Sequence, residues 1–98
     1  MEINKIKNNN NLTIAIKGRL ETTTAPELEI VIKTELEGIT NLVFDFENLD
    51  YISSAGLRVL LSAQKIMNNQ GEMKVIGANE IVMEVFDVTG FSDILTIE

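Results

Sequence analysis

The feature that most constrains this fold is an apolar run followed by a helix and a second apolar run, over residues 42–77. LVFDF, at 42–46, is nearly continuous in apolar character, which is typical of a central strand covered on both faces. A helix is expected from about Ala55 to about Asn69, and MKVIG, at 73–77, supplies another short strand. Strand, helix and strand at this spacing form a βαβ unit, so we predict two parallel strands joined by a right-handed crossover.

The segment before this unit predicts a hairpin and a surface helix. NKIKNNNNLTIAIKG, at 4–18, reads as two strands around an asparagine turn, and alternating apolar residues give the second strand one buried face. TTTAPELEIVIKTELEG, at 22–38, reads as an amphipathic helix with Pro26 in its first turn. Thr24 and Glu27 have the spacing of a capping box, which predicts reciprocal hydrogen bonds at the start of this helix.

The C-terminal part predicts a third helix and a short strand. ANEIVMEVFDVTG, at 78–90, has Asn79 as its expected N-cap and Gly90 as its stop. DILTI, at 93–97, could add a final strand. The side chains of the third helix expected to face inward are Ile81, Val82, Val85 and Phe86.

The composition excludes several classes of function. The 98 residues suit one domain over 1–98, and the absence of cysteine and histidine removes disulfides, the usual zinc ligands and nucleophiles activated by imidazole. No stretch approaches the roughly 18 apolar residues of a membrane span, so we expect a cytoplasmic protein without a membrane partner. Eight basic against fifteen acidic residues give a formal charge of −7. This charge disfavours nucleic acid and suits a protein partner with a basic face, although it can also serve solubility alone.

The start of the helix near Ala55 needs a separate explanation. DYISSAGLRVLL, at 50–61, places two serines and a glycine directly before leucines that suit a core. One serine is explained as an N-cap, whose oxygen accepts a backbone hydrogen bond worth about 1 kcal/mol. Gly56 is not explained in this way, because glycine in a helix costs up to roughly 1 kcal/mol relative to alanine. We expect the bare position to let another backbone or another protein approach closely, which leaves the serines reachable.

Three segments resemble the STAS domain, the fold of bacterial anti-sigma factor antagonists. YISSAGLRVLLSAQK, at 51–65, resembles the motif in which a serine at a helix start is phosphorylated by the cognate anti-sigma factor kinase, and Ser54 takes that place. GRLETTTAPEL, at 18–28, resembles a segment whose acidic residue contacts the kinase, and Glu21 takes that place. FDVTGFSDILTI, at 86–97, resembles the usual C-terminal ending, so the likeness spans nearly the whole chain.

The sequence departs from the family pattern at two positions. Many members have aspartate where Ser53 and Glu21 stand here, and Ser53 is therefore the runner-up for modification. The resemblance implies an α/β fold with a mixed sheet of four to five strands. This sheet consists of the N-terminal hairpin and the parallel βαβ unit, with the helices packed mainly on one face.

The resemblance also implies a function. The unphosphorylated protein is expected to bind an anti-sigma factor serine kinase and free the sigma factor, and phosphorylation of Ser54 is expected to end the interaction. The kinase brings ATP and magnesium, and a separate serine phosphatase resets the serine. The chain itself is then no enzyme and needs neither cofactor nor metal, and we expect a monomer or a weak dimer. The residues expected to contact the partner are Glu21, Thr22, Thr23, Ser53, Ser54, Ala55, Gly56 and Arg58.

Other functions fit the sequence less well. A serine hydrolase lacks the G-x-S-x-G spacing and a histidine base. Asp45, Glu47 and Asp50 suggest a magnesium site, but they lack calcium-loop spacing, and alternate residues leaving a strand usually face water. A small-ligand-binding domain would need a dedicated polar cluster, which we do not find. The serious alternative is a STAS scaffold that is never phosphorylated, as a subunit of a lipid transporter or a stress-signalling assembly.

Overall fold

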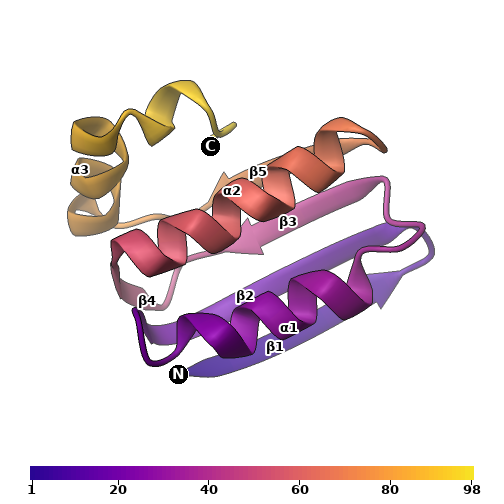
Figure 1. The fold of residues 1–98 in the computed structure, drawn as a ribbon, viewed down its shortest axis with the longest axis horizontal. Coiled ribbons are helices and arrows are strands. Elements are labelled where there is room, and N and C mark those ends of the chain that lie inside the picture. Colours follow the sequence, from indigo (N-terminus) through magenta and orange to yellow (C-terminus); the bar gives the residue numbers. More distant parts are fainter.

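The computed structural model describes residues 1–98 as a mixed five-stranded sheet with three α-helices (Figure 1). The strands are β1 (Glu2–Asn8), β2 (Asn11–Leu20), β3 (Asn41–Asp45), β4 (Leu49–Ile52) and β5 (Glu72–Ile76). The helices are α1 (Ala25–Glu35), α2 (Ser54–Asn68) and α3 (Glu80–Thr89), followed by a short 3-10 helix at Phe91–Asp93. None of the helices combines the length and the hydrophobicity that a membrane-spanning segment requires. The predicted α/β class and mixed sheet are confirmed.

β2 is the strand around which the sheet is organised. β1 pairs with it antiparallel, while β3 pairs parallel with its first half and β4 pairs parallel with its last residues. β3 is paired with β2 up to Ala15 and β4 from Gly18 onward, and the pairing with β4 shifts register between Gly18 and Arg19. Gly18 has φ +103°, a conformation that glycine adopts without a steric penalty. β2 therefore extends from its pairing with β1 and β3 to the end of β4, next to the start of α2.

Two parallel crossovers place the helices on one face of the sheet. β3 and β5 are parallel neighbours, with Phe44 opposite Val75, as the spacing of residues 42–77 predicts. α1 joins β2 to β3 in the same way, and this second parallel pairing was not predicted. α1 and α2 lie side by side over the same face, and α3 stands at one end of the sheet (Figure 1).

The core fills the space between the sheet and these helices. Leu42 and Phe44 of β3 are fully buried, whereas Val43 and Asp45, on the opposite face, are half-buried. The prediction that this strand is covered on both faces is therefore wrong, because both crossovers run on the same side. The alternating Leu12, Ile14 and Ile16 of β2 are buried, as the pattern predicts, and Leu20 at the end of the strand is buried as well.

Thr24 stands before α1 but does not cap it. Its side chain makes no hydrogen bond to the helix N–H groups, so the predicted capping box is absent. The Thr24 hydroxyl instead accepts a hydrogen bond from the Glu21 N–H at 2.9 Å and lies 2.8 Å from the Arg19 carbonyl, to which it donates. Thr24 therefore closes the loop between β2 and α1. Pro26 lies in the first turn of α1, as predicted.

The ends of α3 agree with the sequence, and its orientation differs in one place. The Asn79 side chain accepts a hydrogen bond from the Val82 N–H at 2.8 Å, and Gly90, with φ 80°, ends the helix. Val82 and Phe86 are buried, but Ile81, which we expected inside, is 57% exposed. Residues four apart share one face of a helix, so Val82 and Phe86 define the buried face of α3. Ile81 lies outside this face.

The expected final strand at 93–97 is reduced to a single parallel bridge between Val75 and Ile97. The 3-10 helix takes up residues 91–93 and leaves too few residues for a longer ladder. The Val75 N–H donates to the Thr96 carbonyl at 2.8 Å, and the Glu98 N–H donates to the Val75 carbonyl at 2.9 Å. The C-terminal residues therefore cover only part of the outer edge of β5.

Candidate functional site

Ser54 is the first residue of α2, and it is exposed to solvent. Ser53 alone links it to the end of β4 at Ile52, so regular elements fix its position on both sides. The first backbone N–H groups of a helix have no partners within the helix, which favours an anion there. The first turn of α2 contains no acidic residue. A negative group on Ser54 would therefore meet free N–H groups and no like charge within that turn.

The hydroxyl of Ser53 is inaccessible. Its backbone has the extended conformation of an N-cap (φ −101°, ψ 177°), but its side chain makes no capping hydrogen bond. The Ser53 Oγ is buried and has no hydrogen-bond partner. The expectation that a serine side chain caps this helix is therefore wrong. Of the two serines, Ser54 is the one that a modifying enzyme can reach in the folded protein.

The loop at 21–24 lies beside the start of α2 because both follow paired strands. Leu20, at the end of β2, is paired with Ile52, at the end of β4. The Leu20 carbonyl also accepts a hydrogen bond from the Ser53 N–H at 2.9 Å. The ladder and this hydrogen bond bring together two segments that α1, β3 and β4 separate in the sequence.

The side chain of Glu21 forms an ion pair with Arg19. Arg19 Nε lies 3.2 Å from Glu21 Oε2, and the Arg19 guanidinium carbon lies 4.6 Å from the centre of the Tyr51 ring. Glu21 is half-buried, while Thr22 and Thr23 are exposed. Arg19 and Tyr51, which are opposite each other in the β2–β4 ladder, were not predicted as site residues. Recognising them needs β4, which was not predicted.

A groove of about 410 Å³ runs between α1 and α2 next to this loop. Ala25 and Val59 of its lining are buried apolar residues, while Thr22 and Arg58 are exposed. Arg58 follows Ser54 by one helical turn, and it takes part in none of the ion pairs of the structure. The complete lining is Thr22, Ala25, Pro26, Glu29, Ala55, Arg58, Val59 and Ser62.

Gly56 has a different role from the one expected. It is buried, and a Cβ atom at this position would lie 2.7 Å from Leu20 Cγ and 2.8 Å from Ile52 Cγ1. The close approach that this glycine permits is therefore to side chains of its own chain and not to a partner. Gly56 lets α2 pack tightly on the ends of β2 and β4, which fixes Ser54 beside the loop at 21–24.

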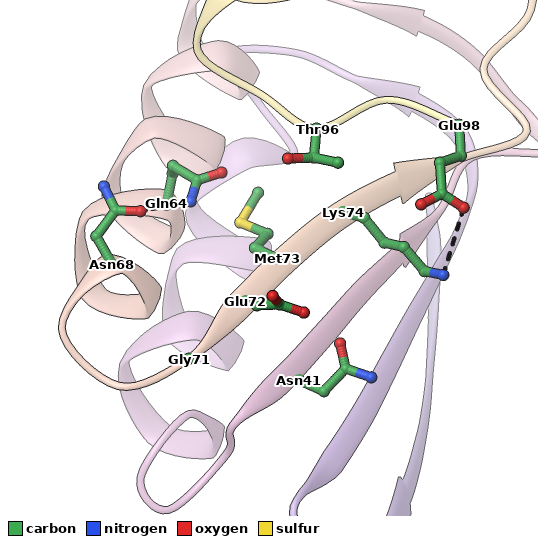
Figure 2. A pocket seen from close by; sticks show the side chains of 9 residues that line it. All are labelled: Asn41, Gln64, Asn68, Gly71, Glu72, Met73, Lys74, Thr96 and Glu98. Atoms are coloured by element: carbon green, nitrogen blue, oxygen red, sulfur yellow. Dashed lines mark hydrogen bonds and ion pairs between the residues drawn. The ribbon is translucent and has the colours of Figure 1, made fainter.

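A second cavity, of about 490 Å³, lies at the other end of α2, beside the edge of β5 (Figure 2). Met73 is its only apolar lining residue. Gln64 Nε2 donates to Asn68 Oδ1 at 2.9 Å, and Lys74 Nζ lies 3.5 Å from Glu98 Oε1 (Figure 2). Gln64 Oε1 is buried without a hydrogen-bond partner, and the cavity lies far from the serines. No group of three or more Asp, Glu, His or Cys side chains in the chain is placed to hold a metal ion.

The family assignment follows from a comparison with family models. The model of the STAS domain matches residues 2–98. The chain belongs to the STAS domain family. In this STAS domain, the motifs at 18–28 and 51–65 are the segments that the Leu20–Ser53 hydrogen bond joins.

Curated relatives of this STAS domain cover most of its length. BtrV of Bordetella bronchiseptica, named as a candidate anti-sigma factor antagonist, is 36% identical over 88 residues, which are 88% of this chain and 76% of BtrV. The anti-sigma-B factor antagonist of Staphylococcus epidermidis is 26% identical over 99 residues and covers 99% of this chain and 92% of the relative.

The fold is also shared with solved structures. The unphosphorylated anti-sigma factor antagonist SpoIIAA has a TM-score of 0.78 at 15% identity and covers 99% of this chain and 87% of that chain. The phosphorylated form of SpoIIAA from Bacillus has a TM-score of 0.77 at 16% identity and covers 99% of this chain and 91% of that chain. The predicted STAS fold is therefore confirmed.

Proposed function

We propose that this protein is an anti-sigma factor antagonist. Its unphosphorylated form binds an anti-sigma factor that is also a serine kinase, and phosphorylation of Ser54 ends the binding. The observation that carries the proposal is the position of Ser54, which is exposed at the start of α2 beside the loop at 21–24. Relatives named as anti-sigma factor antagonists support the same role.

The contact surface consists of the loop, the first turn of α2 and the rim of the groove. Glu21, Thr22 and Thr23 supply one side, and Ser54, Ala55 and Arg58 supply the other. Ser53 contributes through its backbone, since its hydroxyl is buried. Gly56 contributes by packing and touches no partner.

Phosphorylation should leave the fold intact. A phosphate adds about −1.5 to −2 charges and three strong acceptors. At a helix N-terminus a negative group is favourable by about 0.3–1 kcal/mol, because of the free N–H groups and the helix dipole. Arg58, one turn further and without an ion pair, can neutralise part of the added charge.

The complex, in contrast, should be lost. A charged group in a desolvated interface that is arranged for a neutral hydroxyl costs several kcal/mol, and every 1.4 kcal/mol lowers the affinity about tenfold. The same modification therefore has opposite effects on the free protein and on the complex. This difference makes Ser54 suitable as a switch.

The kinase and the phosphatase, and not this chain, supply the catalytic groups for the switch. In the forward step the Ser54 oxygen attacks the γ-phosphorus of ATP, the bond to the β,γ-bridging oxygen breaks, ADP leaves, and the serine proton passes to a base of the kinase. Magnesium and ATP are brought by the kinase. In the reverse step a serine phosphatase uses water to release inorganic phosphate and restore the hydroxyl.

Mass spectrometry of the protein purified from its source cells tests the modification. We expect a phosphopeptide with the phosphate on Ser54, and none in the Ser54→Ala variant. The Ser53→Ala variant should still be phosphorylated, because its hydroxyl is buried in the folded state. Phosphate on Ser53 alone would contradict the assignment. Absence of phosphate under all growth conditions would favour the unphosphorylated scaffold.

Binding to the cognate kinase tests the mechanism. We expect Ser54→Asp to lower the affinity at least tenfold, whereas Asn8→Asp, which adds the same charge at the exposed end of β1, should bind like the wild type. Isothermal titration calorimetry measures both affinities. If Ser54→Asp binds as tightly as the wild type, charge at this position does not act on the interface.

A further inference from the structure

The outer face of α3 carries two exposed apolar side chains. Ile81 is 57% exposed and Val88 is 76% exposed. They lie two helical turns apart and therefore on one stripe of the helix, with the half-buried Val85 between them. Val82 and Phe86 already fill the place of α3 in the core. The outer stripe thus has no partner within this chain.

Three acidic side chains of α3 lie along one side of this stripe. Glu84 is adjacent to it, and Glu80 and Asp87 follow around the helix. None of the three forms an ion pair, although Asp87 accepts a hydrogen bond from the Ser92 hydroxyl. α3 contains no basic residue. The face therefore combines exposed apolar surface with uncompensated negative charge.

The exposed apolar surface and the negative charge together determine which kind of partner can bind this face. A second copy of the chain is disfavoured, because two acidic faces would meet and each chain carries a formal charge of −7. Nucleic acids and anionic membrane surfaces are disfavoured for the same reason. A basic amphipathic helix can cover Ile81 and Val88 with apolar side chains and pair lysine or arginine with Glu80 and Glu84.

We propose that the outer face of α3 is a docking surface for a basic amphipathic helix of a protein partner. The surface is held firmly in place, because Asn79 caps α3 and its Nδ2 donates to the Leu49 carbonyl of β4 at 3.0 Å. β4 leads to Ser54, and α3 stands at the same end of the molecule as the start of α2 (Figure 1). Docking at α3 uses none of the loop and groove residues and is independent of phosphorylation at Ser54.

A titration of the isotope-labelled full chain tests this proposal. The probe is a synthetic peptide of about 18 residues, long enough to form a helix, with leucines on one face and lysines on the other. We expect saturable changes of the NMR shifts centred on residues 80–89. The matched peptide with glutamates in place of lysines should bind at least tenfold more weakly.

Matched variants separate this surface from attraction by charge alone. Ile81→Ser should lower the affinity for the basic peptide at least fivefold. Ile30→Ser, which removes an isoleucine that is 63% exposed on α1, should leave it unchanged. Glu84→Gln should weaken binding more than Glu37→Gln, which removes one exposed charge after α1. Neither Ile81 nor Ile30 is buried, so both serine variants are expected to fold.

Three results would overturn the proposal. Shift changes centred on residues 21–24 or 54–58 would place the peptide on the serine site instead. Equal effects of Ile81→Ser and Ile30→Ser would show attraction by net charge alone. A dimer of the free protein that Ile81→Ser abolishes, measured by analytical ultracentrifugation, would make a second copy the occupant. Since the peptide is tested without any kinase, failure here leaves the proposed function of Ser54 untouched.

Discussion

Ser53 and Ser54 are neighbours in the chain, but the structure gives them different roles. The change from extended to helical backbone between them turns one hydroxyl inward, where it has no partner, and leaves the other residue in solvent. An unpaired buried hydroxyl costs about 1–3 kcal/mol. Gly56 belongs to the same turn, and it lets Leu20 and Ile52 pack against the helix. Accessibility of one serine thus depends on the packing of its neighbours.

Gly56→Ala is expected to lower the free energy of unfolding by about 1–3 kcal/mol, because its methyl group would overlap Leu20 and Ile52. On an exposed helix the same change would stabilise the protein by about 1 kcal/mol, so the sign is informative. Urea unfolding followed by circular dichroism measures it. As a reference, Gly71→Ala should cost more, because its Cβ would lie 2.0 Å from the Thr40 carbonyl oxygen. A Gly56→Ala protein as stable as the wild type would contradict this packing role.

Ser54→Asp should change the free energy of unfolding by less than about 1 kcal/mol, and in the stabilising direction, because the negative charge lies at the start of α2. Urea unfolding at low ionic strength gives the value. Asn68→Asp, at the last residue of the same helix, is the matched control and should be destabilising. Destabilisation of Ser54→Asp by more than the control would refute the claim that the fold tolerates charge at Ser54.

The sequence predicts most of the helices and strands, but it predicts fewer of the contacts between them. The strands at 42–46 and 73–77 and the helix between them follow from apolar periodicity and length, and Asn79 and Gly90 follow from capping chemistry. β4 was missed because its four residues are too few for a periodic pattern. The Thr24 hydroxyl was misassigned because it bonds backbone groups of Arg19 and Glu21, before the helix, in place of the first N–H groups of α1.

Asn79 joins two elements, and its replacement should show both contributions. Asn79→Ala removes the hydrogen bond from the Val82 N–H and the one to the Leu49 carbonyl, and should cost about 1–2 kcal/mol of unfolding free energy. Asn79→Asp keeps the cap and loses only the donor, so it should lie between the wild type and Asn79→Ala. Thermal unfolding ranks the three proteins. Equal stability of all three would mean that neither hydrogen bond contributes.

At the scale of the whole molecule, the negative charge dominates the electrostatics. The molecule extends 32 × 26 × 19 Å. At about 0.01 M salt the Debye length is about 30 Å, so charges across the whole surface repel one another. The four ion pairs are solvent-exposed, and such pairs contribute about 0–1 kcal/mol each.

Stability should therefore rise with salt. Between about 0.01 M and 0.15 M sodium chloride the Debye length falls to about 8 Å, which screens the repulsion more than it weakens the ion pairs. Differential scanning calorimetry should show an increase of Tm over this range. Potassium chloride at equal ionic strength should give the same increase, because the effect is one of screening. A decrease of Tm would mean that the ion pairs outweigh the repulsion.

The site could be predicted from the sequence only in part. Ser54 and Glu21 are assigned by the resemblance of their local segments to family motifs, and their roles in binding stay predictions. Their proximity depends on the pairing of Leu20 with Ile52, which joins distant segments. The burial of Ser53 Oγ and of Gly56 follows from the same pairing, and no local pattern reports it.

The double pairing of β2 also bears on how quickly a partner can be captured. One continuous strand reaches from the hairpin to the loop at 21–24, and its last residues hold the backbone before Ser54. The surface that we propose for the kinase is thus assembled before the two proteins collide, and no segment has to become ordered on arrival. Encounter should then proceed at the rate of orientation-limited diffusion, about 10⁵–10⁷ M⁻¹ s⁻¹, and the lifetime of the complex should set the affinity.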